Sequence, residues 1–283
     1  MKLGEMTYQL LGHLPGYATE SVNTWQRMTA RMAGYGLKLN GIRVLEVGCG
    51  YAYPYVLLFD SAGTDITGID IQALSRRHVG AKGYAPLLKT RGTLPTVRRI
   101  GRDFLFRMAF DRRLQQASNL VIKPRRAKLA RMDAGCMGFA DRTFDFIYSS
   151  ACFEHLEEVP KAAAEIARIL KPGGVVEIEV HLFTSMTGGH EPELYNHRPP
   201  PPHFQLWGHL LDPNWEAPLF LNRWREHQYR NVLTDQFRIR EVMVTSDHGR
   251  QYLTSEIVSR LIPAYSFDEL ATESVLYVLS AKQ

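Results

Sequence analysis

The stretch VLEVGCG at residues 44–50 decides the fold class of this chain. Residues 42–47 form a short, β-branched run that is typical of a buried parallel strand. The run ends in Gly48 and Gly50, and glycine permits both an unusual φ angle and a close approach of a ligand to the backbone. Such a turn lies at the carboxyl end of a strand, where open α/β sheets bind ligands. A ligand-binding turn is therefore expected here, although a tight strand–helix connection would use the same glycines.

Strands and helices alternate outward from this turn. Helices are expected at residues 51–59, 160–170 and 221–233, while further strands are expected at residues 65–70, 127–132, 143–149, 175–181, 237–245 and 274–281. This alternation predicts βαβ units and an α/β fold with a doubly wound, mainly parallel sheet that carries helices on both faces.

The expected organisation is a helical N-terminal cap followed by one large domain. Residues 1–40 read as one or two helices, and residues 41–283 form the domain that contains the sheet. Two segments interrupt the alternating pattern: a basic helical insertion at about 85–126, and a loop at about 182–220 that is rich in histidine, proline and glycine. A proline-rich stretch of this kind excludes a regular helix or a central strand.

The positive charge is concentrated in one segment. The net charge is +5, but residues 89–131 alone hold 13 lysine and arginine residues against two acidic residues. A solvated helical lid or a homodimer contact explains such a segment. Recruitment of an anionic substrate, a carrier protein or RNA explains it as well, and arginine suits bidentate binding of phosphate or carboxylate. Nucleic acid is the less favoured partner, because Phe104, Phe106 and Phe110 fit the buried face of a helix as well as they fit base stacking.

The cysteines and the hydropathy pattern favour a cytoplasmic protein. The three cysteines are odd in number and lack metal-ligand spacing, so neither a disulfide framework nor a cysteine metal site is expected. No uninterrupted apolar run reaches the length of about 18 residues that a membrane span needs. The expectation is therefore a chain in a reducing compartment with no membrane span.

Five segments in order resemble the motifs of class I S-adenosylmethionine (SAM)-dependent methyltransferases: VLEVGCG, ITGIDI, ARMDAGCMGFADRTFDFIYS, FEHLEEV and ARILKPGGVVEIEV. The resemblance covers about half of the chain. It implies a Rossmann-like sheet of seven strands with the last strand inserted antiparallel, SAM as the cofactor and S-adenosylhomocysteine as the product. A nicotinamide enzyme is disfavoured, because the third position of its Gly-x-Gly-x-x-Gly fingerprint is Tyr53 here.

Asp70 ends the second expected strand, 20 residues after Gly50. An acid at this place can accept hydrogen bonds from both ribose hydroxyls, although a solvated acid or a helix N-cap has the same position. The resemblance assigns the acid of the first motif, the glycine turn, the ribose acid, the adenine contacts and the backbone at the methionine end to ten residues: Glu46, Gly48, Cys49, Gly50, Asp70, Ile71, Asp133, Ala134, Ser149 and Ser150. One departure is Ala52, which stands where the family often has a third glycine.

Methyl transfer needs little from the protein beyond alignment and exclusion of water, because the sulfonium already activates the methyl group. An oxygen acceptor also benefits from a general base, and histidine has the most suitable pKa. The candidates are His155, His181 and His190. His190 is favoured because Gly188 and Gly189 are expected to free its loop. For each histidine, an ordinary surface or hydrogen-bonded position remains the alternative.

The loop at 182–220 is the expected acceptor loop. Phe204, Trp207 and the prolines give it walls that suit an apolar or ring-shaped small molecule. Its many histidines raise the question of a metal, but the ligand spacing of a metal site is missing, so no metal is predicted. The favoured function is O-methylation of a small molecule, in secondary metabolism or a glycan pathway. The alternatives are methylation of a nucleic acid or of a carrier-bound anionic substrate, and a SAM-binding protein without activity.

Overall fold

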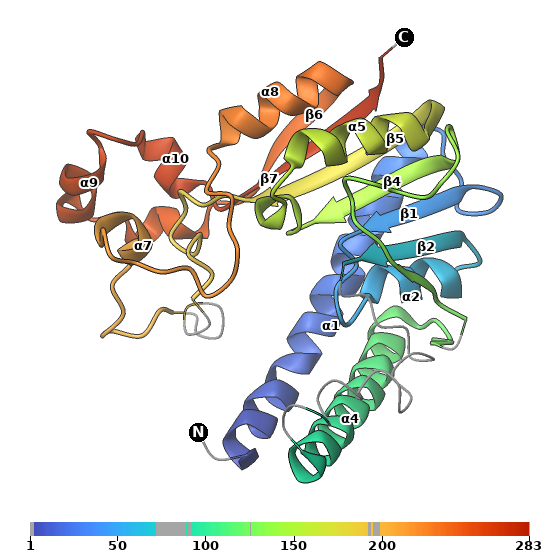
Figure 1. The fold of residues 1–283 in the computed structure, drawn as a ribbon, viewed down its shortest axis with the longest axis horizontal. Coiled ribbons are helices and arrows are strands. Elements are labelled where there is room, and N and C mark those ends of the chain that lie inside the picture. The colour runs from blue at the N-terminus through green and yellow to red at the C-terminus, as the bar shows by residue number, and fades with distance from the viewer. Residues whose placement is uncertain are drawn as a thin grey trace. The chain divides into compact units, whose positions relative to one another are not determined.

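The computed structural model describes residues 3–71, 89, 92–124, 126–191, 194 and 199–282. The described strands form a seven-stranded sheet in the order β3-β2-β1-β4-β5-β7-β6 (Figure 1). Their bounds are β1 Arg43–Val47, β2 Asp65–Asp70, β3 Lys128–Arg131, β4 Phe144–Ser150, β5 Leu170–His181, β6 Phe237–Ser246 and β7 Ser274–Ala281. The predicted α/β class with a doubly wound, Rossmann-like sheet is confirmed.

The helices account for most of the remaining described residues. The α-helices are α1 Leu3–Gly34, α2 Pro54–Ser61, α4 Thr93–Ser118, α5 Val159–Ile169, α7 Gly208–Leu211, α8 Glu226–Gln236, α9 Ser255–Leu261 and α10 Phe267–Ala271. Two short 3₁₀ helices are η1 Phe153–His155 and η2 His248–Tyr252. The N-terminal segment is thus one helix, and most of the basic segment is another. The start of that segment, residues 85–88, 90 and 91, lies outside the described residues.

The strand pairing follows the expected direction. β2 pairs in parallel with both β1 and β3. β7 runs antiparallel between β5 and β6 and pairs with both along most of its length. The expectation that the last strand is inserted antiparallel is therefore confirmed.

Three expected boundaries were wrong. Helix α2 begins at Pro54 and not at residue 51, because Tyr53 adopts a left-handed φ of 38°. Helix α8 begins at Glu226, five residues later than the apolar pattern suggested. Strand β5 begins at Leu170, because the backbone becomes extended directly after α5 and Pro172 cannot continue a helix.

The chain divides into two compact units: residues 1–134 with 143–146, and residues 135–142 with 147–283. In the first unit, α1 and α4 lie side by side (Figure 1). Tyr17 of α1 stacks on Phe110 of α4 with ring centroids 5.2 Å apart, and Phe106 stacks on Phe110 at 6.0 Å. Phe104 was expected on the same buried face, but 62% of its surface is exposed, because α4 turns it away from α1.

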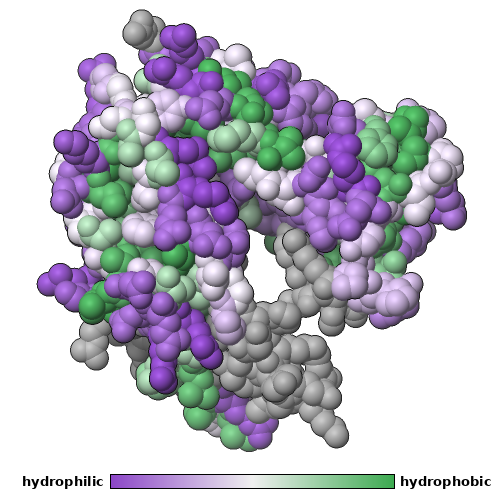
Figure 2. Space-filling view, turned by 180° about the vertical axis from the view of Figure 1, so that it is seen from behind, coloured by the Kyte–Doolittle hydropathy of each residue, from purple (hydrophilic) through white to green (hydrophobic). Residues whose placement is uncertain are grey.

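The second unit has a core of its own beyond the sheet. Met186, Trp207, Leu261 and Leu270 form a buried cluster that joins the loop after β5 to helices α9 and α10. None of the described helices combines the length and the apolar character that a membrane crossing requires. Hydrophilic side chains are spread over the described part of the face that Figure 2 shows.

A residue without a side chain positions the ligand-binding edge of the first unit. Gly68 lies in the middle of β2, and a Cβ at this position would come within 2.6 Å of Val56 Cγ2 and 2.9 Å of Leu129 Cδ2. It would also come within 3.1 Å of the Cβ of Cys49, in the turn after β1. Only glycine therefore lets α2, β3 and the turn after β1 pack this closely around β2.

We predict that Gly68→Ala lowers the free energy of unfolding by roughly 1–3 kcal/mol, as overpacking of a core does. Gly101→Ala is a matched control, because a Cβ at Gly101 of α4 meets nothing within 4 Å. Alanine there is expected to stabilise the helix by roughly 0.5–1 kcal/mol. Urea unfolding followed by circular dichroism measures both effects. Equal unfolding midpoints for Gly68→Ala and the wild type would show that the packing at β2 is looser than described.

Candidate active site

The turn after β1 has the backbone that the glycine motif requires. Gly48 and Gly50 adopt φ angles of 77° and 63°, which L side chains rarely adopt. The N–H groups of Gly48 and Cys49 donate to the carbonyl of Ile69 at 2.8 and 3.0 Å, so the end of β2 fixes the turn. A Cβ on Gly50 would meet nothing within 4 Å. The turn is therefore rigid, and the space beside Gly50 is open to a ligand.

Asp70 lies beside this turn. Its Oδ2 accepts a hydrogen bond of 2.9 Å from the N–H of Gly50, and the side chain is half-buried at the end of β2. The backbone carbonyl of Asp70 accepts from the N–H of Met132, just before Asp133. The structure thus brings together the glycine turn, Asp70 and the segment that carries Asp133. Of the other predicted residues in this group, Cys49 and Ala134 are buried, whereas Ile71 and Asp133 are exposed.

Glu46 faces helix α2 from β1. Its Oε2 accepts a hydrogen bond of 3.1 Å from the N–H of Val56, in the first turn of α2. Burial raises the pKa of this carboxyl to about 8; the hydrogen bond from Val56 lowers it, and the charge of Asp70 raises it further. A carboxylate at a helix N-terminus satisfies a backbone donor that has no partner within the helix. Glu46 therefore ties β1 to the first turn of α2 and stabilises the connection between them.

Arg107 of α4 is a residue that the sequence did not single out. Its side chain is buried, its Nη1 donates to the hydroxyl of Tyr53 at 3.2 Å, and its guanidinium lies 4.2 Å from the centroid of the Tyr51 ring. Its Nε and Nη2 atoms have no hydrogen-bond partner among the described residues. Buried donors of a charged group are costly when unpaired, so this guanidinium is suited to an anionic ligand. The only sequence signal was the dominance of arginine in the basic segment.

The tyrosines that follow the glycine turn differ in exposure. Tyr53 is 2% exposed, and Tyr51 is 38% exposed. Packing therefore buries the ring of Tyr53, whereas the ring of Tyr51 stays partly exposed. Both rings lie against Arg107, with Tyr53 at 5.8 Å.

Ser149 and Ser150 end β4 in the second unit. Ser149 is fully buried, and its hydroxyl has no partner among the described residues. The hydroxyl of Ser150 donates to Glu179 of β5 at 2.7 Å, and the N–H of Ala151 donates to the backbone carbonyl of Glu179 at 3.1 Å. These bonds hold the carboxyl end of β4 against β5.

All three candidate bases meet in this second unit. His181 is the last residue of β5, and its Nδ1 lies 3.0 Å from Nε2 of His190. The ring of His155 stands edge-on to His190, with centroids 4.8 Å apart, and its Nδ1 lies 3.0 Å from the carbonyl of Phe220. His181 is buried, whereas His155 and His190 are half-buried. Burial first, and then the nearby histidines, lower the pKa of His190 to about 3, so its imidazole is neutral at physiological pH.

Glu154 joins these histidines, although no sequence motif singled it out. It lies in η1, and its carboxylate, His181 and His190 each offer one ligand atom within 4.8 Å of the others. Burial raises the pKa of Glu154 to about 8 against a smaller lowering by the nearby backbone N–H groups of Glu154 and His181. Both carboxylate oxygens are buried without a hydrogen-bond partner among the described residues.

The glycines before His190 act differently from the expectation. Gly188 was expected to free the loop, but it is buried, and a Cβ there would come within 2.2 Å of the backbone oxygen of Phe183. A Cβ on Gly189 would collide with the carboxylate of Glu191. The expectation was therefore wrong: the glycines allow a tight fold that brings His190 back to His181.

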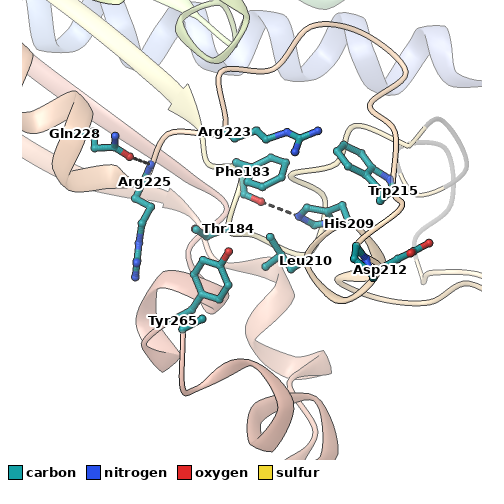
Figure 3. A pocket seen from close by; sticks show the side chains of 12 residues that line it. Phe183, Thr184, His209, Leu210, Asp212, Trp215, Arg223, Arg225, Gln228 and Tyr265 are labelled. Atoms are coloured by element: carbon teal, nitrogen blue, oxygen red, sulfur yellow. Dashed lines mark hydrogen bonds between the residues drawn. The ribbon is translucent and has the colours of Figure 1, made fainter.

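A pocket of about 480 Å³ opens beside this loop (Figure 3). Phe183 and Trp215 form aromatic walls with ring centroids 6.0 Å apart, and Tyr265 reaches toward the space from the segment before α10. The guanidinium of Arg223 lies 5.7 Å from the Phe183 ring and 5.4 Å from the Trp215 ring. His209 lies 2.7 Å from the carbonyl of Phe183 through its Nε2. The pocket thus combines flat apolar surfaces with one exposed cation, Arg223, and one exposed anion, Asp212.

The aromatic residues of this pocket were not the expected ones. Trp207 was expected to form a wall of the acceptor site, but its side chain has no exposed surface and belongs to the buried cluster around Met186. Its indole N–H donates to the carbonyl of Thr184, which satisfies the one polar atom of the ring. Trp215, eight residues later, lines the pocket. His197, one of the histidines of this loop, lies outside the described residues.

The residues of the first unit fit the cofactor that the motifs imply. A nucleoside needs close approach to the backbone, which the open space at Gly50 allows, and an acidic acceptor beside it, which Asp70 supplies. The methionine part of SAM carries a carboxylate, and the unpaired donors of Arg107 offer a partner for such a group.

Residues 17–236 match the family described as a methyltransferase domain. This match covers most of the chain, so the chain belongs to the methyltransferase domain family, and SAM is the methyl donor that this family implies.

Two relatives match parts of the chain. Phosphoethanolamine N-methyltransferase 2 of Caenorhabditis elegans is 36% identical over 59 residues, which are 21% of this chain and 14% of that protein. A sterol 24-C-methyltransferase of Gibberella zeae is 25% identical over 147 residues, which are 52% of this chain and 29% of that protein. The matches thus span less than a third of either relative.

Among solved structures, a SAM-dependent methyltransferase from Mesorhizobium loti is 15% identical, with a TM-score of 0.48. The alignment covers 89% of this chain and 96% of that protein.

An ion pair holds the pocket wall to α10. Arg225 donates from Nε and Nη2 to the two carboxylate oxygens of Glu269, both at 2.6 Å. Glu269 also accepts from the N–H of Ser266 and thereby caps the helix that follows. The hydrogen bonds from Arg225 lower the pKa of Glu269 to about 2, below its ordinary value of 4.5.

We therefore predict a pH-dependent contribution of Glu269 to stability. A carboxyl with a lowered pKa stabilises the fold above its unfolded pKa, and the stabilisation is lost as the pH falls. The difference in unfolding free energy between the wild type and Glu269→Gln is expected to be full at pH 6 and to shrink from about pH 4.5 toward pH 2. Urea unfolding across this range measures it. Glu256→Gln, on the exposed side of α9, is the control. A difference that stays constant with pH would contradict the lowered pKa.

Proposed function

We propose that this protein transfers the methyl group of SAM to a hydroxyl oxygen of a small, ring-bearing acceptor that carries an acidic group. In this step the acceptor oxygen forms a bond to the methyl carbon while the bond from that carbon to the sulfonium sulfur breaks. S-adenosylhomocysteine leaves as a neutral thioether, and the hydroxyl proton has to be taken up. The observation that carries the choice of oxygen is the cluster of His155, His181 and His190, because methylation of a hydroxyl needs help with that proton.

The cofactor side of the proposal rests on three groups of the first unit. The open turn at Gly50 admits the cofactor to the backbone, and Asp70 accepts hydrogen bonds from the ribose. The unpaired donors of Arg107 bind the carboxylate of the methionine moiety. Glu46 stays with α2 and keeps the turn in place.

The acceptor side rests on the pocket of the second unit. Its volume of about 480 Å³ is in the range of small-molecule sites. The rings of Phe183 and Trp215 provide flat apolar surfaces for a ring. Arg223 is exposed and forms no ion pair with a described residue, so it offers its guanidinium to a carboxylate or phosphate on the acceptor.

The pocket and the histidine cluster belong to one segment of chain. Phe183 lies two residues after His181, and Trp215 donates its indole N–H to Glu191, the neighbour of His190, at 2.8 Å. An acceptor packed against these rings therefore rests on the same loop that carries His190. Burial keeps the imidazole of His190 neutral at physiological pH, so it can accept a hydrogen bond from a hydroxyl.

We predict that Asp70→Ala weakens binding of SAM by about 10- to 100-fold, the loss expected when hydrogen bonds to a charged group are removed. Asp65→Ala is the control, because Asp65 lies at the other end of β2 and pairs with Lys128 and Arg43 on the surface. Calorimetric titration with SAM and S-adenosylhomocysteine measures both variants. If Asp70→Ala folds and binds SAM as tightly as the wild type, Asp70 is not the ribose acceptor.

The acceptor class is tested with SAM and a panel of hydroxylated aromatic acids, their neutral analogues, amines and carbon nucleophiles. We expect O-methylated product and equal amounts of S-adenosylhomocysteine with the hydroxylated acids. Arg223→Gln should raise KM for these acids by about 10- to 100-fold and leave kcat close to the wild-type value, since a charge-assisted bond is lost from binding. Arg260→Gln, on the surface of α9, is the control.

Three results would contradict this proposal. SAM binding without turnover across the panel would identify a SAM-binding protein without activity. Methylation of nitrogen or carbon acceptors alone would move the acceptor atom away from oxygen. Methylation of nucleic acid with a strong dependence on salt would identify the basic segment as the acceptor site.

A further inference from the structure

In the cluster at the ends of β4 and β5, His181 and His190 are hydrogen-bonded to each other, but no side chain of a described residue bonds the carboxyl group of Glu154 beside them. His181 Nδ1 and His190 Nε2 face each other at 3.0 Å, and the carboxylate of Glu154 lies within 4.8 Å of both histidine ligand atoms. Glu154 is 2% exposed, and neither of its carboxylate oxygens has a hydrogen-bond partner among the described residues. A buried carboxyl group that no side chain bonds either takes up a proton or binds a cation, and as a metal ligand it is ionised.

A chain of hydrogen bonds fixes the tautomer of His181. Thr187 donates its hydroxyl proton to Glu273, because a carboxylate can only accept. The oxygen of Thr187 then accepts from Nε2–H of His181 at 2.8 Å. In the neutral imidazole, Nδ1 of His181 is consequently unprotonated, and its lone pair points toward His190. Ser246 donates to the other oxygen of Glu273 and holds the chain in place.

These hydrogen bonds resemble those of the second coordination shell of a metal site. A histidine that binds a metal through one nitrogen donates the other N–H to a carboxylate, a carbonyl or water, which orients the ring and raises its basicity. His181 does this through Thr187 to Glu273. The carboxyl group of Glu273 thus ends this chain of hydrogen bonds, two bonds from the His181 ring.

The distances fit a cation between the side chains. Two nitrogens that bind one ion at about 2.0–2.1 Å and at right angles lie about 3.0 Å apart. This is the separation of His181 Nδ1 and His190 Nε2. The carboxylate of Glu154 lies within 4.8 Å of both ligand nitrogens, so a shift of up to about 1.5 Å brings it to the same ion.

We propose that Glu154, His181 and His190 form a binding site for one divalent transition-metal ion. Two imidazoles and one carboxylate suit Zn²⁺, Mn²⁺, Fe²⁺ or Co²⁺ and leave open positions for water or an acceptor oxygen. The sequence spacing conceals this site, because its ligands come from η1, the end of β5 and the loop after β5.

The role of this metal site in catalysis rests on the proposed function. A divalent cation lowers the pKa of a hydroxyl that binds to it, so the acceptor oxygen loses its proton more readily. In that arrangement His190 holds the cation, and His155, which is outside the ligand group, remains beside it. Metal binding itself needs neither SAM nor an acceptor, so it can be measured separately from activity.

The test is calorimetric titration of the metal-stripped chain with Zn²⁺, together with the visible absorption of the Co²⁺-loaded chain. We expect one ion per chain with micromolar or tighter affinity and a rise in melting temperature. Glu154→Gln keeps the shape of the side chain and should weaken binding by at least about 100-fold, since it removes the only charged ligand. Thr187→Val leaves the three ligands in place and should weaken binding by about 10- to 100-fold, as loss of an outer-shell partner does.

His227→Gln is the control, because His227 is exposed on α8 away from the cluster and should leave the affinity unchanged. His190→Gln is a second ligand variant in case Glu154→Gln does not fold, and its side chain is half-buried. The absence of stoichiometric binding by the folded wild type would overturn the proposal, as would an affinity that Glu154→Gln and His190→Gln both leave unchanged. Titration of the same samples with SAM separates the two proposals: lost metal binding with retained SAM binding rejects the metal site alone.

Discussion

The first unit depends on the absence of a side chain at Gly68. Because β2 presents no Cβ there, Val56 of α2 and Leu129 of β3 approach its backbone closely, and the turn after β1 lies directly against it. That approach places the N–H of Gly50 on the carboxylate of Asp70, and it places the N-terminus of α2 on the carboxylate of Glu46. The polar contacts of the proposed cofactor site thus follow from the close packing around β2.

The second unit buries many polar groups around His181. Thr187 and Ser246 hold the carboxylate of Glu273, and the imidazole of His181 continues this chain toward His190. Glu154 stands outside the chain, with both oxygens unsatisfied among the described residues. A buried carboxyl group without hydrogen bonds destabilises a fold unless a ligand binds it. Glu154 differs in this respect from Glu273, whose oxygens are both hydrogen-bonded.

The fold and the contact between the glycine turn and Asp70 could be predicted from the sequence because their signals are local. A strand, a glycine turn and an acid 20 residues later lie close together in the chain, and the structure brings Gly50 and Asp70 into contact. The part played by Glu154 could not be predicted, because in FEHLEEV it looks like its exposed neighbours Glu157 and Glu158, and only the folded chain decides which carboxylate is buried.

In the loop at 182–220, the sequence likewise does not show which aromatic side chains are buried. Trp207 and Trp215 lie in one irregular segment, and the sequence does not distinguish the ring that enters the core from the ring that lines a pocket. The choice depends on contacts with Met186, Leu261 and Leu270, which come from distant segments. Arg107 could not be selected either, because the sequence does not distinguish it from the other arginines of α4. Its contacts with Tyr51 and Tyr53 appear only in the folded chain.

The position of β7 has a consequence for the order of events during synthesis. β5 and β6 leave the ribosome before β7, yet each pairs with β7 and they do not neighbour each other in the sheet. Until Ser274–Ala281 arrives, both strands expose an edge that invites pairing with other chains. Glu273 immediately precedes β7, and its backbone carbonyl accepts from Leu182 in the loop that carries Thr187. The nascent chain therefore acquires the last sheet contact and the carboxylate behind His181 in a single late step.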